Sequence, residues 1–267
     1  MSSIAVTRTP AADTVRQVVV GVSAVIAVVG SFVGSGAAGG TPINEAAGGA
    51  LAADATQVAP GWPAFSIWSV IYLGLLGYAV WQLLPAQRAA RRHRLLGYPV
   101  AASLLLNAAW ILSIQFDLLA LSVPIVVALL VVLIWAFSRT LAEQPTSRVD
   151  AVVTDGTIGL YLGWVCVATV ANVAAVLVAA GFDGLGISAD FWGGLVALIA
   201  GLVGVLLAVK DRGRLAPTLS LCWGLAWIAV ARFAGPLVSE PTAWACVAAV
   251  AAVVATTLML RTRAGWR

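Results

Sequence analysis

Eight long apolar stretches, separated by short polar segments, constrain this chain more than any other feature of its sequence. A helix needs about 20 apolar residues to cross the hydrocarbon core of a bilayer. Only 10% of the 267 residues are charged, against roughly 25% in a soluble domain. We therefore predict an all-α integral membrane protein. The predicted spans are residues 16–35, 65–84, 97–116, 118–138, 156–180, 191–210, 215–235 and 242–260.

The basic residues predict how these spans are oriented. Of the 15 Lys and Arg residues, 14 lie at or before the start of the first span, after the last span, or in the loops that follow even-numbered spans, with Lys210 at the very end of the sixth. Loops that follow odd-numbered spans have none. Because basic residues collect on the cytoplasmic side, we expect a multi-pass protein of a bacterial inner membrane with both termini cytoplasmic. Residues 1–15 then form a cytoplasmic N-terminal tail.

The first apolar stretch has an alternative interpretation. It follows Arg16 and ends in small residues, GSGAAGG, as a cleaved signal peptide does. The stretch is longer than the usual apolar part of a signal peptide, which favours a retained helix. The sequence GSFVG at 30–34 has small residues four apart, a spacing that lets another helix approach closely.

Several classes of function find no support in the composition. The net charge of +4 comes from arginines beside apolar spans, so we expect no nucleic acid partner. The single histidine, His93, and the three cysteines have no metal-ligand spacing, and we expect no metal site. No nucleophile–base set or carboxylate pair lies within a span, so we predict no catalytic residues.

Aromatic and polar residues recur at helical spacing in three of the spans. They share one face of each predicted helix and lie at similar depth, below a loop stiffened by Pro60 and Pro63. An asparagine in hydrocarbon must satisfy its amide, so Asn107 and Asn172 should face the bundle interior. They could hold neighbouring helices together, or orient a ligand in a pocket that opens outward. The set in the spans consists of Phe65, Trp68, Tyr72, Asn107, Trp110, Trp164, Ala168 and Asn172, and Trp62 in the loop above completes nine candidate ligand-binding residues.

Three segments carry a family resemblance. PGWPAFSIWSVIY (60–72), LNAAW (106–110) and LYLGWVCVATVAN (160–172) resemble successive motifs of the TspO/MBR family, the tryptophan-rich sensory or translocator proteins. The chain lacks the Lys and the first Trp that usually precede the first motif. In the third motif, Val167 and Ala171 replace a Phe and a Leu, which makes that wall of the site smaller.

The resemblance implies a five-helix bundle over residues 16–180 that binds tetrapyrroles such as protoporphyrin IX or haem. Neither would be an obligatory cofactor. The nine residues above would line the pocket, and the family tends to form homodimers. Residues 181–267 would add a three-helix extension. The implied function is binding and sensing, with a small-molecule transporter or a light-dependent porphyrin-degrading protein as alternatives.

Arg232 is the basic residue outside the alternating pattern, three residues from the outer end of the seventh span. Its long side chain could reach toward water and Glu240. Alternatively it could face inward and pair with Asp117, Asp183 or an anionic group of a ligand, such as a porphyrin propionate.

Overall fold

The structure, a computed structural model, describes residues 10–264 and confirms an all-helical chain with eight candidate membrane spans. Short helices α2 (Ala46–Gly49), η2 (Pro85–Gln87) and η4 (Gly184–Gly186) lie between them. The spanning elements are α1 (Pro10–Gly34), η1 (Trp62–Ser66) with α3 (Ile67–Trp81), α4 (Arg91–Gln115), α5 (Leu119–Ala142), α6 (Arg148–Asp150) with η3 (Ala151–Gly156) and α7 (Thr157–Ala179), α8 (Ala189–Asp211), α9 (Leu215–Ala234), and α10 (Glu240–Ala264).

Several spanning helices begin earlier than predicted, among them the fifth, which starts at Arg148 rather than at residue 156. Helix α1 begins at Pro10, so residues 10–15 are helical; the predicted tail at 1–9 lies outside the described residues. Helix α4 begins at Arg91, which places Arg92, His93 and Arg94 on a helix rather than in a loop. Apolar character alone could not show this, because a helix can continue past the bilayer core into polar surroundings.

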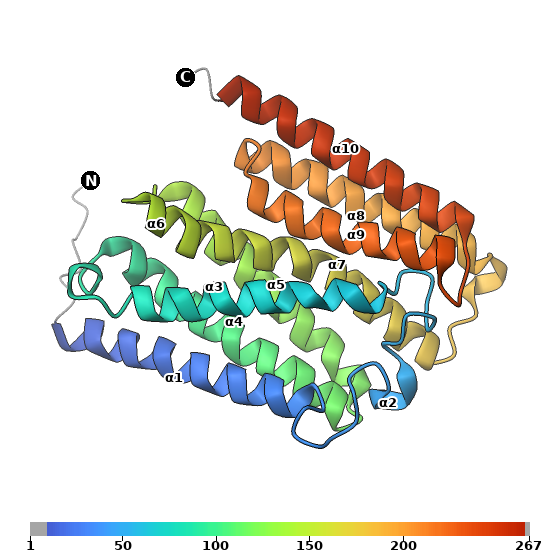
Figure 1. The fold of residues 1–267 in the computed structure, drawn as a ribbon, viewed down its shortest axis with the longest axis horizontal. Helices are drawn as coiled ribbons and strands as arrows, with labels where there is room; N and C mark the ends of the chain where they lie inside the picture. The colour runs from blue at the N-terminus through green and yellow to red at the C-terminus, as the bar shows by residue number, and fades with distance from the viewer. Residues whose placement is uncertain (1–9, 265–267) are drawn as a thin grey trace.

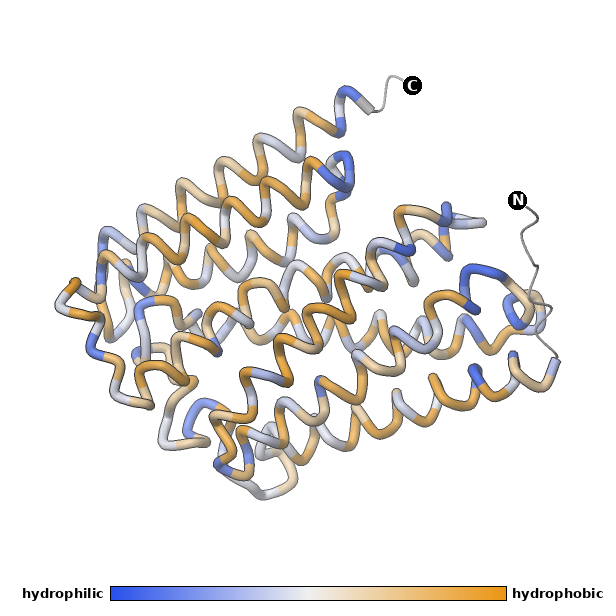
Figure 2. The backbone as a smooth tube through the Cα atoms, turned by 180° about the vertical axis from the view of Figure 1, so that it is seen from behind, coloured by the Kyte–Doolittle hydropathy of each residue, from blue (hydrophilic) through white to orange (hydrophobic). Residues whose placement is uncertain are grey.

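The long helices run up and down along one common direction, with apolar residues along their lengths and polar residues at their ends (Figures 1 and 2). The start of α1 and the end of α10 lie at the same end of the molecule. We call this the arginine-rich end, because the loops with basic residues are there. The arginine-poor end carries segment 35–61, the turn at Asp117, and segments 180–188 and 235–239.

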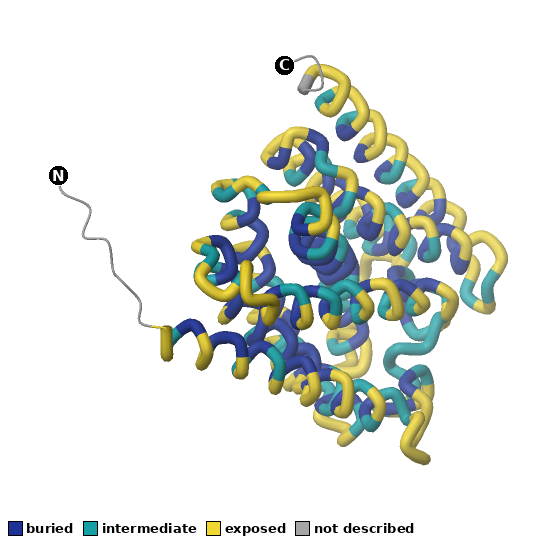
Figure 3. Tube along the Cα trace, turned by 60° about the vertical axis from the view of Figure 1, so that its left-hand side comes forward, coloured by how far each residue is buried: buried dark blue, intermediate teal, exposed yellow. Residues whose placement is uncertain are grey.

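Helix α1 packs closely along α4 through the glycines of GSFVG. A Cβ atom added to Gly30 would lie 2.9 Å from the Cβ of Ala108, and one added to Gly34 would meet Ile111. The close approach predicted from the small residues is therefore confirmed. The opposite face of α1 is exposed, as is much of α10 (Figure 3).

Two hydrophobic clusters divide the interior. One joins α1, α3, α4, α5 and α7, and the other joins α8, α9 and α10 with Val167 of α7. Small residues bring the C-terminal helices together: Cβ atoms added to Gly201 and Gly204 would meet Ala249 and Val253 of α10. The domain boundary at residue 180 stays a prediction, because α7 contributes to both clusters.

Segment 50–61 crosses the arginine-poor end and is attached to the C-terminal helices. The amide of Gly61 donates to the carbonyl of Trp227 at 3.2 Å, and the Trp223 indole donates to the carbonyl of Ala64 at 2.9 Å. The Gln57 amide donates to Asp190 at the start of α8, at 3.2 Å. A segment rich in Gly and Ala, which has little bulk of its own to bury, thus gains its order from other elements.

Candidate functional site

The nine predicted ligand-binding residues all lie in the half of the bundle nearer the arginine-poor end, but the structure distributes them over two adjoining spaces. Trp62 and Phe65 are in η1, Trp68 and Tyr72 in α3, Asn107 and Trp110 in α4, and Trp164, Ala168 and Asn172 in α7.

The larger space is an open groove of about 570 Å³ between α1 and α3, with α4 as its floor. We call it the aromatic groove. Its volume falls in the range of about 300–1,000 Å³ that drug-sized ligands occupy. Its lining includes the exposed side chains of Phe32 on α1 and Trp62 on η1. Six predicted residues line it: Trp62, Phe65, Trp68, Tyr72, Asn107 and Trp110.

The smaller space is an inner cavity of about 40 Å³ between the aromatic groove and α7. Trp164, Ala168 and Asn172 line this cavity and not the groove, and Phe65, Trp68 and Trp110 border both. Residues 50, 51, 56, 59 and 60 cover it. The cavity is small although Val167 and Ala171 replace larger residues, because segment 50–60 fills the space above them.

Aromatic contacts, three of them edge to face and one between tilted rings, fix the wall between the two spaces. The Phe65 ring lies 5.6 Å from that of Trp62 and 5.9 Å from that of Trp164. The Trp68 ring lies 5.7 Å from Tyr161 and 6.2 Å from Trp164. Such contacts stabilise each ring orientation by about 0.5–1.5 kcal/mol beyond burial alone. The groove therefore has a wall of preorganised ring faces and edges.

The floor of the aromatic groove is polar. The Asn107 amide nitrogen donates to the Tyr72 hydroxyl at 2.7 Å, and that hydroxyl is also hydrogen-bonded to Ser31 of α1. Asn107 is only 4% exposed, yet its side-chain oxygen has no hydrogen-bond partner. A buried unpaired acceptor is costly, so it marks a position where a ligand donor would be stabilised.

Asn172 has a different role. Its oxygen accepts from the Trp110 indole at 2.9 Å, and its nitrogen donates to Ser122 of α5 at 2.8 Å. These two hydrogen bonds join α4, α7 and α5, and they use both the oxygen and the nitrogen of the Asn172 amide. Both asparagines therefore make helix–helix contacts, but Asn172 uses its whole amide for them, whereas Asn107 bonds Tyr72 of α3 through its nitrogen and leaves its oxygen without a partner.

Sequence reasoning missed four serines that line the aromatic groove. Ser31 is in α1 and Ser35 directly follows the end of that helix, while Ser66 is in η1 and Ser69 in α3. Their spacings, i and i+4 or i and i+3, were a signal that could have been read. With Asn107 and Tyr72 they supply neutral hydrogen-bonding groups; of the described residues that line the groove, none is acidic or basic.

Arg232 faces inward, but it lines neither the aromatic groove nor the inner cavity. It is fully buried (0% exposed), so the expectation that it reaches out toward water is wrong. Among the described residues, Asp117, Asp183 and Glu240 form no ion pair with it, and a contact with an anionic ligand stays a prediction. Its guanidinium donates to the backbone carbonyls of Thr56, at 3.1 Å, and Ala53. Arg232 therefore holds segment 53–56 against α9.

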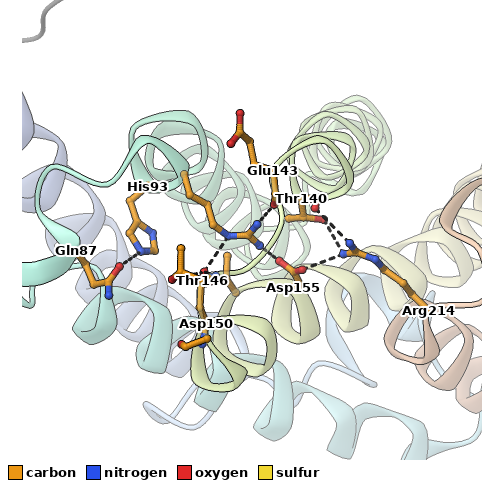
Figure 4. A network of polar contacts seen from close by, with 11 residues as sticks. Gln87, His93, Thr140, Glu143, Thr146, Asp150, Asp155 and Arg214 are labelled. Atoms are coloured by element: carbon orange, nitrogen blue, oxygen red, sulfur yellow. Dashed lines mark hydrogen bonds and ion pairs between the residues drawn. The ribbon is translucent and has the colours of Figure 1, made fainter. Parts of the chain in front are cut away.

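A second polar network lies at the arginine-rich end (Figure 4). Arg92 of α4 pairs with Asp150, at 3.3 Å, and with Asp155 of the π-helical segment η3. Arg214 pairs with the other oxygen of Asp155 at 3.0 Å and donates to the carbonyl of Thr140 at 3.3 Å. The network joins α4, α5, η3 and the start of α9, and each carboxylate is used between helices rather than facing a cavity.

Comparison with known families gives one match. The sequence model of a family described as TSPO-like protein matches residues 20–259. The match runs through α8, α9 and α10 as well as through the five preceding spans. Searches of curated proteins and of solved structures return no match.

Proposed function

The chain belongs to the TSPO-like family of membrane proteins, and on that premise we propose that it binds a flat hydrophobic ligand of the tetrapyrrole class in the aromatic groove. Protoporphyrin IX and haem are the candidate ligands. The ring faces of Trp62, Trp68 and Trp110 would contact the macrocycle. Tyr72 and Asn107 would orient it.

One observation carries this proposal: the unpaired, buried oxygen of Asn107 at the floor of an aromatic groove within the membrane-spanning region. In hydrocarbon a polar atom without a partner is stabilised only by protein or by a bound molecule. Family membership supports a ligand, and the groove supplies a place for it. The four serines that line the groove would offer further hydrogen bonds to the ligand.

The lining also predicts how the acidic groups of a porphyrin are placed. Because the described residues of both spaces offer no guanidinium or ammonium, the propionates would extend past Trp62, which is 57% exposed, toward water. The dimethyl ester of protoporphyrin IX should therefore bind within about threefold of the free acid. A preference of tenfold or more for the acid would contradict this placement.

We propose that the groove binds its ligand without catalysing a reaction on it. Among the described lining residues of the groove only Tyr72 carries an ionisable group, and it is already hydrogen-bonded to Asn107 and Ser31. Such a set can hold and orient a molecule, but it offers no general acid–base pair.

The test is a titration of detergent-purified protein with protoporphyrin IX, followed by the Soret absorbance of the porphyrin. Ser69→Trp places an indole in the groove from an exposed position and should weaken binding at least about tenfold. Leu219→Trp adds the same side chain on an exposed face of α9, away from the groove, and should leave binding unchanged. Equal affinities for the two variants would overturn the proposal.

The two asparagines provide a second comparison. Asn107→Leu should weaken porphyrin binding and lower the melting temperature less than Asn172→Leu, because it removes one interhelical hydrogen bond, to Tyr72, rather than two. Asn172→Leu should lower the melting temperature, since it breaks two interhelical hydrogen bonds, each contributing about 0.6–2 kcal/mol. Its affinity for porphyrin should stay within about threefold of the unaltered protein.

A further inference from the structure

A second open groove, of about 490 Å³, lies at the arginine-poor end between segment 54–58, the last turns of α7 and the first turns of α8. We call it the acidic groove. It shares no lining residue with the aromatic groove. Thr56 separates it from the inner cavity and borders both. The acidic groove is thus a distinct site, formed where the first five spans meet the last three.

One side of the acidic groove is apolar and aromatic. Leu177 and Val178 of α7 face Phe182 and Trp192, whose rings lie 6.1 Å apart edge to face. The Trp192 indole donates to the carbonyl of Gly184 at 3.0 Å, which fixes its ring. This side would accommodate a hydrophobic body and offers aromatic faces to a positive charge.

The other side offers acceptors. Asp54 and Asp183 line the groove, and of its described lining residues none is basic. Gln57 donates to Asp190, while its own side-chain oxygen is buried without a partner. Thr56 is only 6% exposed, and its hydroxyl also has no partner. Arg232 does not line the groove; its guanidinium donates to the carbonyls of Thr56 and Ala53 and interacts electrostatically with Asp54, so Asp183 is the carboxylate farther from a positive charge of the protein.

From this arrangement we infer that the acidic groove binds an amphiphilic organic cation, with an apolar or aromatic body and a single positive charge. The two carboxylates attract the charge, and their attraction is stronger near the membrane than in bulk water. The apolar wall removes the body of the ligand from water. A groove that bound its ligand by hydrophobic contact alone would bind a cation and an anion of the same shape equally well. A preference for the cation is therefore the property that tests the inference.

Tetraphenylphosphonium and tetraphenylborate, which share one shape and carry opposite charges, are the probes. Equilibrium dialysis of each radiolabelled ion against the full-length protein in a neutral detergent, with empty micelles as reference, measures binding. We expect saturable binding of one tetraphenylphosphonium per chain, at least about tenfold tighter than tetraphenylborate. Equal binding of both ions, or binding no greater than to empty micelles, would overturn the inference.

Matched variants locate the site. Asp54→Asn with Asp183→Asn should weaken tetraphenylphosphonium binding at least about fivefold. Glu45→Gln, an exposed acid at the same end that lines neither groove, should leave it unchanged. If the two aspartates can be replaced without loss, the cation binds elsewhere and the inference fails.

A steric pair tests the same site without altering charge. Val196→Trp fills the acidic groove and should abolish saturable binding, whereas Leu198→Trp on an exposed face of the same helix should not. Ser69→Trp, which blocks the aromatic groove, should also leave cation binding intact. Loss of cation binding in Ser69→Trp but not in Val196→Trp would assign the ion to the aromatic groove and overturn the inference.

Discussion

Among single residues, Arg232 shows how a buried guanidinium can hold a distant backbone segment in place by hydrogen bonds. A guanidinium within an apolar helix requires acceptors, and segment 53–56 provides them in the carbonyl oxygens of Ala53 and Thr56. Hydrogen bonds to charged groups contribute about 1.5–3 kcal/mol each, although desolvation of the charge offsets part of this. The residue therefore orders a segment that has little apolar bulk.

Arg232→Met should release segment 50–60 while the helices remain folded. We expect faster amide hydrogen exchange in that segment and a loss of about 1–3 kcal/mol in the free energy of unfolding. Arg232→Gln, which keeps a donor amide, should show a smaller change, and Arg261→Met on the exposed end of α10 none. Unchanged exchange in Arg232→Met would show that the segment is held by its other contacts.

For single residues, the sequence predicted which side chains point inward but not the partners that they contact. The helical spacings of Phe65, Trp68, Tyr72, Asn107 and Trp110 placed them correctly on inward faces. The sequence could not separate the roles of Asn107 and Asn172, because their environments differ only through partners distant along the chain. The partners of Arg232 were beyond reach for the same reason, since segment 53–56 is 176 or more residues away along the chain.

At the scale of helices, the contact between α1 and α4 sets the width of the aromatic groove. Gly30 lets the two backbones approach, and that approach places Ser31 against Tyr72 on the groove floor. The sequence predicted this close contact, because small residues four apart on a spanning helix let a neighbouring helix approach. The sequence did not predict the π-helical segment η3, which carries Asp155, because apolar periodicity gives no sign of such a turn.

Gly30→Val should push α1 away from α4. The new side chain would meet Ala108 at less than a normal contact distance, and such overpacking costs about 1–3 kcal/mol. Gly21→Val on the same helix meets no atom within 4 Å and shares the same change in helix propensity. The first variant should lower the melting temperature and weaken porphyrin binding relative to the second. Equal behaviour would mean that the groove tolerates a displaced α1.

At the scale of the whole molecule, the last three helices are joined to the first five at both ends. Arg214 reaches Asp155 and Thr140 at the arginine-rich end, and Arg232 and Asp190 hold segment 53–57 at the other. The family match across residues 20–259 is consistent with one continuous assembly. The acidic groove exists only where these two groups of helices meet.

The separation of an arginine-rich end from an arginine-poor end allows the predicted orientation in the membrane to be tested. Arg92 and Arg94 are paired with aspartates, yet acidic residues contribute little to orientation, so the arginine-rich end should still be cytoplasmic. In a variant without Cys166, Cys222 and Cys246, a membrane-impermeant maleimide should label Leu185→Cys, where the native side chain is 74% exposed, in intact cells. Thr262→Cys, exposed in the last turn of α10, should be labelled only after the cells are opened. The reverse pattern would place both termini outside and turn the mouths of both grooves toward the cytoplasm.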